Sequence, residues 1–271
     1  MGLSVLFNTP SLAAQNQLTQ TNNSLENTLT QLTTGSRINS GADDPAGLQI
    51  SNLLNASIAA LNQSVNNASN GIGIAQVADG ALSQVSTLLN TAVTLATEAS
   101  NGGLSSKEAT ALNTEYQNIL TEVGNIGSNT NYNGSAVFTT TATAVFLTDL
   151  ATSYTISITP GTLTTTALGL NGTDLTSTAS ASTALSDLSN AITSVGSIRG
   201  TIGAAMVQMQ DGQNVDTVEA QNTTTALSTI QSANIPQVVS NLTKYTILDQ
   251  TGIAALTQAN SIPQALLKLI P

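Results

Sequence analysis

The sequence predicts a mainly α-helical fold: an elongated antiparallel coiled-coil bundle formed by the N- and C-terminal segments, with a small middle segment that contains a β-hairpin. Apolar residues recur at every seventh position toward both ends of the chain, and a Thr-rich segment between residues 139 and 180 interrupts the pattern. A seven-residue apolar repeat is typical of helices that pack side by side as coiled coils. The two ends of the chain are therefore expected to meet.

The first helical segment is expected to stop at Gly35. Leu18, Leu25 and Leu32 recur every seventh residue, and Leu29 precedes the last of them by one helical turn. This spacing places an apolar row on one face of a helix. Glycine directly after the last apolar position is a common helix C-terminus.

A second and much longer helix is expected from about residue 45 to residue 99. Asp44 suits the N-cap and Pro45 the first helical position, while Asn101-Gly102-Gly103 ends the pattern. Such a helix would extend roughly 80 Å at about 1.5 Å per residue, which indicates coiled-coil packing. One heptad row contains Leu54, Leu61, Ala68, Ala75, Leu82, Leu89 and Ala96, and a parallel row contains Ile58, Val65 and Ile72.

A third helix is expected from about 105 to 126, where "NIGSNTNYNG" ends it. The stretches "TTTATAVFLTD" and "ATSYTISITPG" then predict one or two β-hairpins. In the second stretch Tyr154, Ile156 and Ile158 alternate with Thr155 and Ser157, as in a strand with one buried face.

The fourth helix has the clearest heptad pattern. A region with a weaker helical pattern follows it and contains Gly212 and Pro236. A last helix is expected from about 237 to 259. Arg199 is expected to be a buried charge that sets the register of the coiled coil at some cost in stability. One heptad position holds Leu188, Val195, Ile202 and Met209, and the other holds Leu185, Ile192, Arg199 and Met206.

Composition limits the classes of function. The 271 residues include 5 Lys+Arg against 15 Asp+Glu, which gives a formal net charge of -10 and no basic patch. Nucleic acid and anionic membrane surfaces are therefore not expected as partners. Cys and His are absent, so the chain has no disulfide, no Cys/His zinc site and no imidazole base. Neither a cofactor nor an enzymatic activity is expected.

Targeting segments are not apparent. The N-terminal "MGLSVLFNTPSLAAQNQ" lacks a basic region and has too few apolar residues for a cleaved signal peptide. The C-terminal "IPQALLKLIP" is too short to cross a bilayer, which takes about 20 residues. If the protein leaves the cell, another route is expected.

The stretch "GSRINSGADDPAGLQI", residues 35 to 50, concentrates charge in a chain that has little. Asp43 and Asp44 could form an acid/base pair, or they could cap the helix that starts beside Pro45. Capping is favoured because no nucleophile, metal ligand or base lies nearby, and because carboxylates are attracted to the positive end of a helix.

The chain contains three long motifs, "LTTGSRINSGADDPAGLQISNLL", "NNASNGIGIAQVADGALSQVSTLL" and "NLTKYTILDQTGIAALTQANSIPQALLKLI". They resemble motifs of bacterial flagellin, the subunit of the flagellar filament. The resemblance covers roughly residues 1–138 and 181–271. It implies an inner terminal coiled-coil domain of 1–40 with 235–271, an outer helical-bundle domain of 41–138 with 181–234, and a short variable, β-rich, solvent-facing segment at 139–180.

The resemblance also implies a joint between the two tubes of a filament. Arg37 is expected to pair with Asp43 or Asp44, within the chain or across subunits, and the joint residues are Arg37, Asn39, Asp43, Asp44 and Pro45. Terminal packing is assigned to Leu18, Leu25, Leu29, Leu32, Leu242, Leu248 and Leu256. The coiled-coil core is assigned to Leu54, Leu61, Leu82, Leu89, Leu188, Val195, Arg199, Ile202 and Met209. The terminal rows are expected to be mobile in the monomer and to order on assembly.

Partners and location follow from the same resemblance. It implies an open helical filament of identical subunits, an export chaperone at the C-terminal region, hook-associated and cap proteins at the filament ends, and an extracellular location reached through the flagellar channel without a cleaved signal. A flagellin-like hook–filament junction protein is the nearest alternative. A coiled-coil adhesin or secretion-tip protein is a more distant one.

Overall fold

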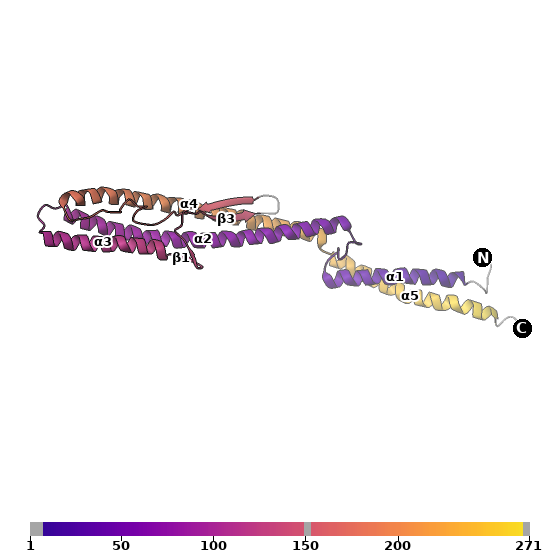
Figure 1. Cartoon of the computed structure of the whole chain (residues 1–271). Coiled ribbons are helices and arrows are strands. Elements are labelled where there is room, and N and C mark those ends of the chain that lie inside the picture. The colour runs from indigo at the N-terminus through magenta and orange to yellow at the C-terminus, as the bar shows by residue number, and fades with distance from the viewer. Residues whose placement is uncertain (1–7, 149–152, 268–271) are drawn as a thin grey trace. The chain divides into compact units, whose positions relative to one another are not determined.

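Figure 1 shows a computed structural model of the chain, which describes residues 8–148 and 153–267. The chain divides into two compact units: a terminal unit of Met1–Ala56 with Asn222–Pro271, and a central unit of Ser57–Gln221. The mainly helical fold is confirmed. In chain order the elements are α1 Thr9–Thr34, α2 Pro45–Ala99, α3 Ser106–Asn129, β1 Asn131–Tyr132, β2 Ser135–Ala136, β3 Thr143–Thr148, β4 Ser153–Ile158, α4 Thr178–Gln231 and α5 Ile235–Leu267.

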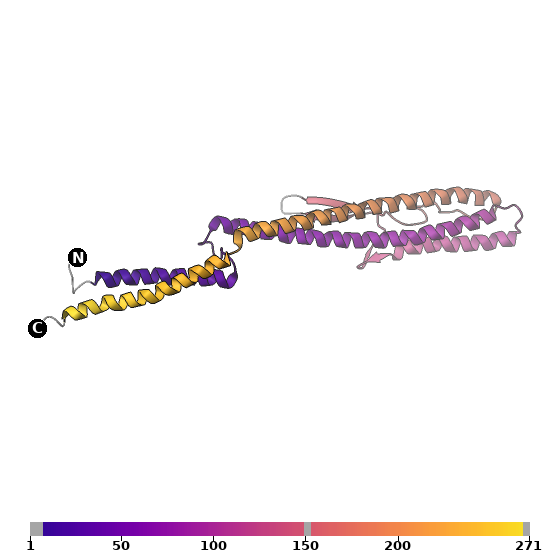
Figure 2. The same cartoon turned by 180° about the vertical axis from the view of Figure 1, so that it is seen from behind.

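In the terminal unit, α1 and α5 lie side by side and run antiparallel (Figures 1 and 2). At one end the side-chain amide of Asn8 donates to the Ala259 carbonyl at 3.0 Å. At the other end the backbone N–H of Arg37 donates to the Gln231 carbonyl at 2.7 Å. The meeting of the N- and C-terminal segments, expected from their apolar repeats, is confirmed.

The α1 row that faces α5 follows the heptad, but its most deeply buried members are threonines. Leu18, Leu25 and Leu32 are half-buried as predicted. Thr21 and Thr28, on the adjacent heptad row, are only 4% and 6% exposed. Each hydroxyl donates to the carbonyl four residues earlier, which satisfies the buried oxygen inside its own helix.

Two predicted terminal packing residues lie outside the contact between α1 and α5. Leu29 is 44% exposed and Leu248 is 41% exposed, so neither belongs to the α1–α5 contact. Leu29 follows the buried Thr28 directly, and one residue turns a side chain by about 100° around a helix, away from the contact. Leu242 and Leu256 are half-buried on α5 and do lie on the packing face.

The central unit packs α2 along a regular a/d heptad seam, the row of positions that faces the neighbouring helices. Leu61, Leu82 and Leu89 are fully buried there, as predicted, while Leu54 is half-buried and belongs to the terminal unit. The second row of the seam differs from the predicted row of Ile58, Val65 and Ile72, which is half-buried. It consists of Val85 and the small residues Ser64, Gly71, Ala78, Ala92 and Ala99.

Small side chains in this second row let other elements approach α2 closely. A Cβ atom placed on Gly71 would lie 2.6 Å from the Met209 sulfur and 2.6 Å from a Val145 methyl. These distances are too short for any real side chain, so α4 and β3 occupy the space that glycine leaves free.

On α4, one of the two predicted heptad rows is buried as expected, and the other is not. Leu188, Val195, Ile202 and Met209 are at most 1% exposed. The second row holds alanines at 184, 191 and 205 together with Ile198, whereas the predicted row of Leu185, Ile192 and Met206 lies half-buried on the flank.

The weakening of the helix predicted around Gly212 is also wrong, because α4 continues unbroken to Gln231. Gly212 is a packing position instead. A Cβ atom there would lie 2.8 Å from a Leu147 methyl, so glycine lets the β3–β4 hairpin pack on α4. The helix break falls at residues 232–234, just before Pro236 in the first turn of α5.

Helix α3 begins with a capping box that the sequence carries as Ser105-x-x-Glu108. The Ser105 hydroxyl accepts from the Glu108 N–H at 3.4 Å, and the Glu108 carboxylate accepts from the Ser105 N–H at 2.7 Å. After α3, β1 and β2 form a tight hairpin whose turn residues Asn133 and Gly134 have φ values of 49° and 80°. Positive φ at both positions is typical of a two-residue type I′ turn.

The β-hairpin predicted between residues 139 and 180 is formed by β3 and β4, which pair antiparallel. Ile156 and Ile158 are buried, whereas Tyr154 on the same alternation is 54% exposed. The following loop contributes further buried leucines at 163, 168, 170 and 175 to the same core. The apolar positions of this segment therefore pack on the central unit, which corrects the expectation of a solvent-facing segment at those positions.

Candidate functional site

The loop of residues 35–44 is attached to the break between α4 and α5. Gly35 ends α1 with φ 66°, a left-handed conformation that glycine adopts without strain, and its carbonyl accepts from the Ala233 N–H at 2.9 Å. Ser36 pairs with Ser232 in an isolated antiparallel bridge. The loop after α1 and the loop after α4, almost two hundred residues apart in the chain, are thereby joined by backbone hydrogen bonds within the terminal unit.

Arg37 caps the C-terminal end of α4. Its guanidinium donates from Nη2 to the Ile230 carbonyl at 3.0 Å, and its backbone N–H donates to Gln231. The last carbonyls of a helix have no partners within the helix and carry partial negative charge, so a cation stabilises them. The predicted pairing of Arg37 with Asp43 or Asp44 within the chain is wrong: the ion pair found among the described residues joins other groups.

Asp43 folds the loop back on itself. One carboxylate oxygen accepts from the Asn39 N–H at 3.0 Å, from the Ser40 N–H at 2.8 Å and from the Ser40 hydroxyl at 3.1 Å. These bonds, led by that from Asn39, hold the pKa of Asp43 below its usual value. The side chain of Asn39 in turn donates to the Ser36 carbonyl at 2.8 Å. Asp43 is thus a local acceptor rather than a proton donor.

Asp44 is the N-cap of α2, as the sequence predicts. Its carboxylate accepts from the Gly47 N–H at 2.9 Å, and Pro45 occupies the first helical position. A Cβ atom on Gly47 would collide with the Asp44 carboxylate and with a methyl of the buried Ile38. Both aspartates therefore serve the loop and the helix start, and the described residues contain no group of three or more metal-ligating side chains.

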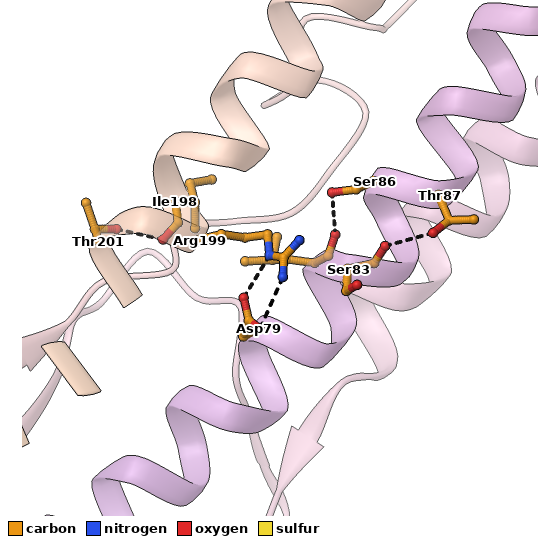
Figure 3. Close-up of polar contacts among 8 residues, drawn as sticks. Asp79, Ser83, Ser86, Thr87, Ile198, Arg199 and Thr201 are labelled. Carbon is orange, nitrogen blue, oxygen red and sulfur yellow. Dashed lines mark hydrogen bonds and ion pairs between the residues drawn. The ribbon is translucent and has the colours of Figure 1, made fainter. Parts of the chain in front are cut away.

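In the central unit the described ion pair links α2 to α4. Arg199 Nε donates to Asp79 Oδ1 at 2.7 Å, and Nη2 donates to Oδ2 at 3.3 Å (Figure 3). The side chains are 37% and 34% exposed, so the predicted buried charge is wrong. The hydrogen bond to Asp79 raises the pKa of Arg199 further above its already high value. The pair lies beside the seam because Ile198, not Arg199, occupies the heptad position.

Two further polar contacts between α2 and α4 escaped the sequence prediction. The Ser64 hydroxyl donates to the Asp216 carboxylate at 2.5 Å, and the Gln213 side chain donates to the Ser69 hydroxyl at 2.9 Å. Asp216 lies seven residues after Met209 and Gln213 lies seven residues after Met206, so both continue heptad rows predicted for the fourth helix. Their partners Ser64 and Ser69 lie outside the two rows predicted for α2, so the heptad count could have found only the α4 side of each contact.

The terminal unit also carries apolar side chains that its own packing leaves exposed. On α5, Val239 is 44% and Ile253 is 51% exposed, and they lie two heptads apart on one side of the helix. Among the described residues of this unit, the other large exposed apolar side chains are Leu12, Leu29, Ile50, Leu53, Ile235, Ile247 and Leu248. A lone helical pair cannot cover them, which leaves a surface suited to a partner.

Comparisons with known proteins match both ends of the chain. Residues 5–143 match the family model of the bacterial flagellin N-terminal helical region, and residues 185–270 match that of the C-terminal helical region. Flagellin of Listeria monocytogenes is 30% identical over 99% of both chains.

The chain belongs to the bacterial flagellin family. Flagellin of Halalkalibacterium halodurans is likewise 30% identical, over 97% of this chain and 98% of that protein. The 30.7 kDa flagellar filament core protein of Treponema maltophilum is 28% identical over the same shares. A crystal structure of Bacillus cereus flagellin aligns with a TM-score of 0.49 and 25% identity, covering 55% of this chain and 88% of that one.

Membership of the flagellin family establishes the role of this chain. It is a structural subunit that polymerises into the bacterial flagellar filament, the helical propeller of swimming motility. The family is one of structural proteins, and its filaments are extracellular. No helix in the described part of the chain is both long and apolar enough to span a membrane.

Proposed function

We propose that each subunit contributes an inner and an outer domain to the filament. Residues 1–40 with 235–271 form its inner coiled-coil domain, and 41–138 with 181–234 form its outer helical bundle. Residues 139–180 cover part of that bundle and present their polar positions to solvent. The antiparallel α1–α5 pair and the heptad seams of α2 and α4 support this division.

The proposal for how the terminal unit assembles rests on its exposed apolar residues. Val239 and Ile253 on α5 have no cover within the unit that the structure describes. On polymerisation they pack against neighbouring subunits, and the gain is about 25 cal/mol for each Å² of apolar surface removed from water. The charged residues are few, so little desolvation of ions opposes this burial.

A double charge substitution tests this surface. Val239→Asp with Ile253→Asp is expected to abolish elongation from filament seeds, because burying two carboxylates without partners is costly. The matched control, Ser240→Asp with Thr251→Asp, adds the same charge to exposed polar positions on α5 and is expected to elongate. Electron microscopy counts filaments, and circular dichroism verifies helicity. Elongation of the Val239/Ile253 variant would refute the assigned surface.

The joint residues Arg37, Asn39, Asp43, Asp44 and Pro45 are proposed as the second set of assembly contacts. Arg37 uses Nη2 to cap α4, which leaves the rest of its guanidinium for a carboxylate of a neighbouring subunit. Arg37 and Asp43 are both exposed in the described chain.

A mutant cycle tests the joint. Arg37→Ala is expected to give shorter and less heat-stable filaments, and Arg37→Lys an intermediate result because lysine keeps the charge but loses the planar fork. Combining Arg37→Ala with Asp43→Asn is expected to cost less than the sum of the single changes if the two side chains meet across subunits. Arg37→Ala filaments as long and stable as the parent's would remove Arg37 from the contact set.

The remaining partners are proposed from membership of the flagellin family, and the same exposed surface supports the first of them. Before assembly, the apolar side of α5 needs a cover, which an export chaperone at residues 235–271 supplies. Hook-associated and cap proteins take the place of neighbouring subunits at the two filament ends. Export proceeds through the flagellar channel without a cleaved signal. Intact-mass analysis of the exported protein tests this route, since a shortened N-terminus would contradict it.

A further inference from the structure

Four Asn-Gly pairs occur in the chain: Asn70-Gly71, Asn101-Gly102, Asn133-Gly134 and Asn171-Gly172. In such a pair the backbone nitrogen of glycine can attack the side-chain carbonyl carbon of asparagine, because glycine lacks the Cβ that would hinder the approach. The reaction requires the asparagine side chain and the following backbone to rotate freely. The four pairs differ in how firmly the surrounding backbone is held.

Asn101-Gly102 is the least constrained pair. It lies in the turn between α2 and α3, both residues are exposed, and a Cβ atom built on Gly102 or on Gly103 would meet nothing within 4 Å. Asn133-Gly134 and Asn171-Gly172 are equally exposed and open, so the distinction between the pairs rests on how their backbone is held. The Asn101 N–H donates to Glu98 at 3.1 Å, but no hydrogen bond holds the Asn101 side chain or the Gly102 N–H in the described structure. Two consecutive glycines add backbone freedom after the asparagine.

The other three pairs are held in place. Gly71 lies inside α2 and packs against Met209 and Val145, so its N–H belongs to the helical ladder. Asn133 is fixed at the turn of the β1–β2 hairpin with φ 49°. The Asn171-Gly172 turn is anchored through Thr173, whose hydroxyl bonds the Tyr116 hydroxyl at 2.6 Å and whose carbonyl accepts from Gln117 at 2.7 Å.

We infer that Asn101 is a site of spontaneous deamidation in this protein. The Gly102 nitrogen forms a bond to Cγ of Asn101 and gives up its proton to solvent base, while the Cγ–Nδ2 bond breaks and the nitrogen leaves as ammonia. Water then opens the cyclic imide. Opening at one carbonyl yields aspartate, and opening at the other yields isoaspartate, whose backbone is one atom longer.

The product changes the end of the central unit in two ways. A carboxylate at residue 101 is ionised at neutral pH, so it adds one negative charge to a chain of formal net charge -10. That charge lies just beyond the C-terminal end of α2, where the helix dipole is already negative. Isoaspartate also lengthens the connection to the Ser105 cap of α3.

Peptide mass mapping of the purified full chain, incubated in warm, mildly alkaline buffer, tests this inference. Deamidation of Asn101 is expected to exceed that of Asn70 by at least about tenfold, which corresponds to ~1.4 kcal/mol of barrier, and to precede that of Asn133 and Asn171. The same incubation in denaturant is the matched control, since unfolding should bring the four rates together.

A variant gives a second readout. Asn101→Gln is expected to abolish the fast phase of ammonia release while leaving the far-ultraviolet circular dichroism unchanged, because the longer side chain must close a less favourable ring. Equal or slower reaction at Asn101 than at Asn133 or Asn171 in the folded chain would overturn the inference. So would an unchanged order of rates in denaturant, or an unchanged fast phase in Asn101→Gln.

Discussion

The Arg199–Asp79 pair shows how little a well-formed but exposed ion pair contributes compared with a seam residue nearby. Both side chains are about one-third exposed, so solvent screens their attraction. Arg199→Ala is expected to cost at most about 1 kcal/mol of unfolding free energy. Leu188→Ala, at a fully buried position of the same helix, is expected to cost about 2–5 kcal/mol. Urea unfolding compares them, and a larger loss for Arg199→Ala would contradict this ranking.

Asp43 gives the joint a defined response to acid. Its pKa in the folded chain lies below that of the unfolded chain, which is about 3.9, so the carboxylate stabilises the loop above that pH. This contribution is lost as the pH falls through the folded-state pKa. Asp43→Asn is therefore expected to be less stable than the parent at neutral pH, with the difference vanishing in acid. Thermal unfolding across pH measures it; a difference that grows on acidification would refute the role.

At the scale of an element, α3 contains two glycines that should respond oppositely to the same change. A Cβ atom on Gly127 would overlap the Leu163 carbonyl oxygen, whereas a Cβ atom on Gly124 would meet nothing within 4 Å. Gly127→Ala is expected to destabilise the protein by about 1–3 kcal/mol, because the backbone at Leu163 must move. Gly124→Ala is expected to stabilise it by roughly 0.5–1 kcal/mol through helix propensity. Equal effects of both would show that the loop does not pack on α3.

At the scale of the whole molecule, the two units differ in how well each is packed by itself. The central unit has a continuous buried core, whereas the terminal helices bury few side chains completely. Amide exchange in the monomer is therefore expected to be faster throughout α1 and α5 than along the seams of α2 and α4, and to slow on polymerisation. Equally strong protection of both units in a verified monomer would contradict this.

Salt should have little effect on the assembled filament. Only 7% of the residues are charged, and the α5 surface proposed for assembly is apolar, so the charged joint around Arg37 is the smaller part of the contact. Debye screening weakens contacts between charges but leaves apolar burial intact. Filaments are expected to keep their length when NaCl is raised, as measured by sedimentation and electron microscopy. Dissociation in NaCl would indicate that ion pairs dominate the contacts.

Helix boundaries were predictable from the sequence because their signals are local. Gly35, Asp44 with Pro45, and the Asn101-Gly102-Gly103 turn end or begin helices through the conformations and hydrogen bonds of a few neighbouring residues. The exception is Gly212, where glycine fits the methyl of Leu147 and does not interrupt α4. Residue type alone cannot distinguish a glycine that ends a helix from one that admits a neighbour.

The candidate site was predictable in its location but not in its contacts. The cluster of Arg37, Asp43 and Asp44 was identified from its charge, yet Arg37 bonds to carbonyls of Ile230 and Gln231 at the far end of the chain. Attraction between nearby opposite charges suggested the wrong partner. The unsatisfied carbonyls at the end of α4 are a competing partner that only the folded chain brings within reach.

By itself, the amino-acid sequence determined the helices, most of their ends and the spacing of the heptad rows, because backbone propensity and capping act over a few residues. It also determined the family, through three long motifs in order. The tertiary structure decided which row faces inward and which residues meet across the chain. Alanine, threonine and glycine occupy the closest contacts because packed helices leave little volume between them, and that volume is a property of neighbours distant in the sequence.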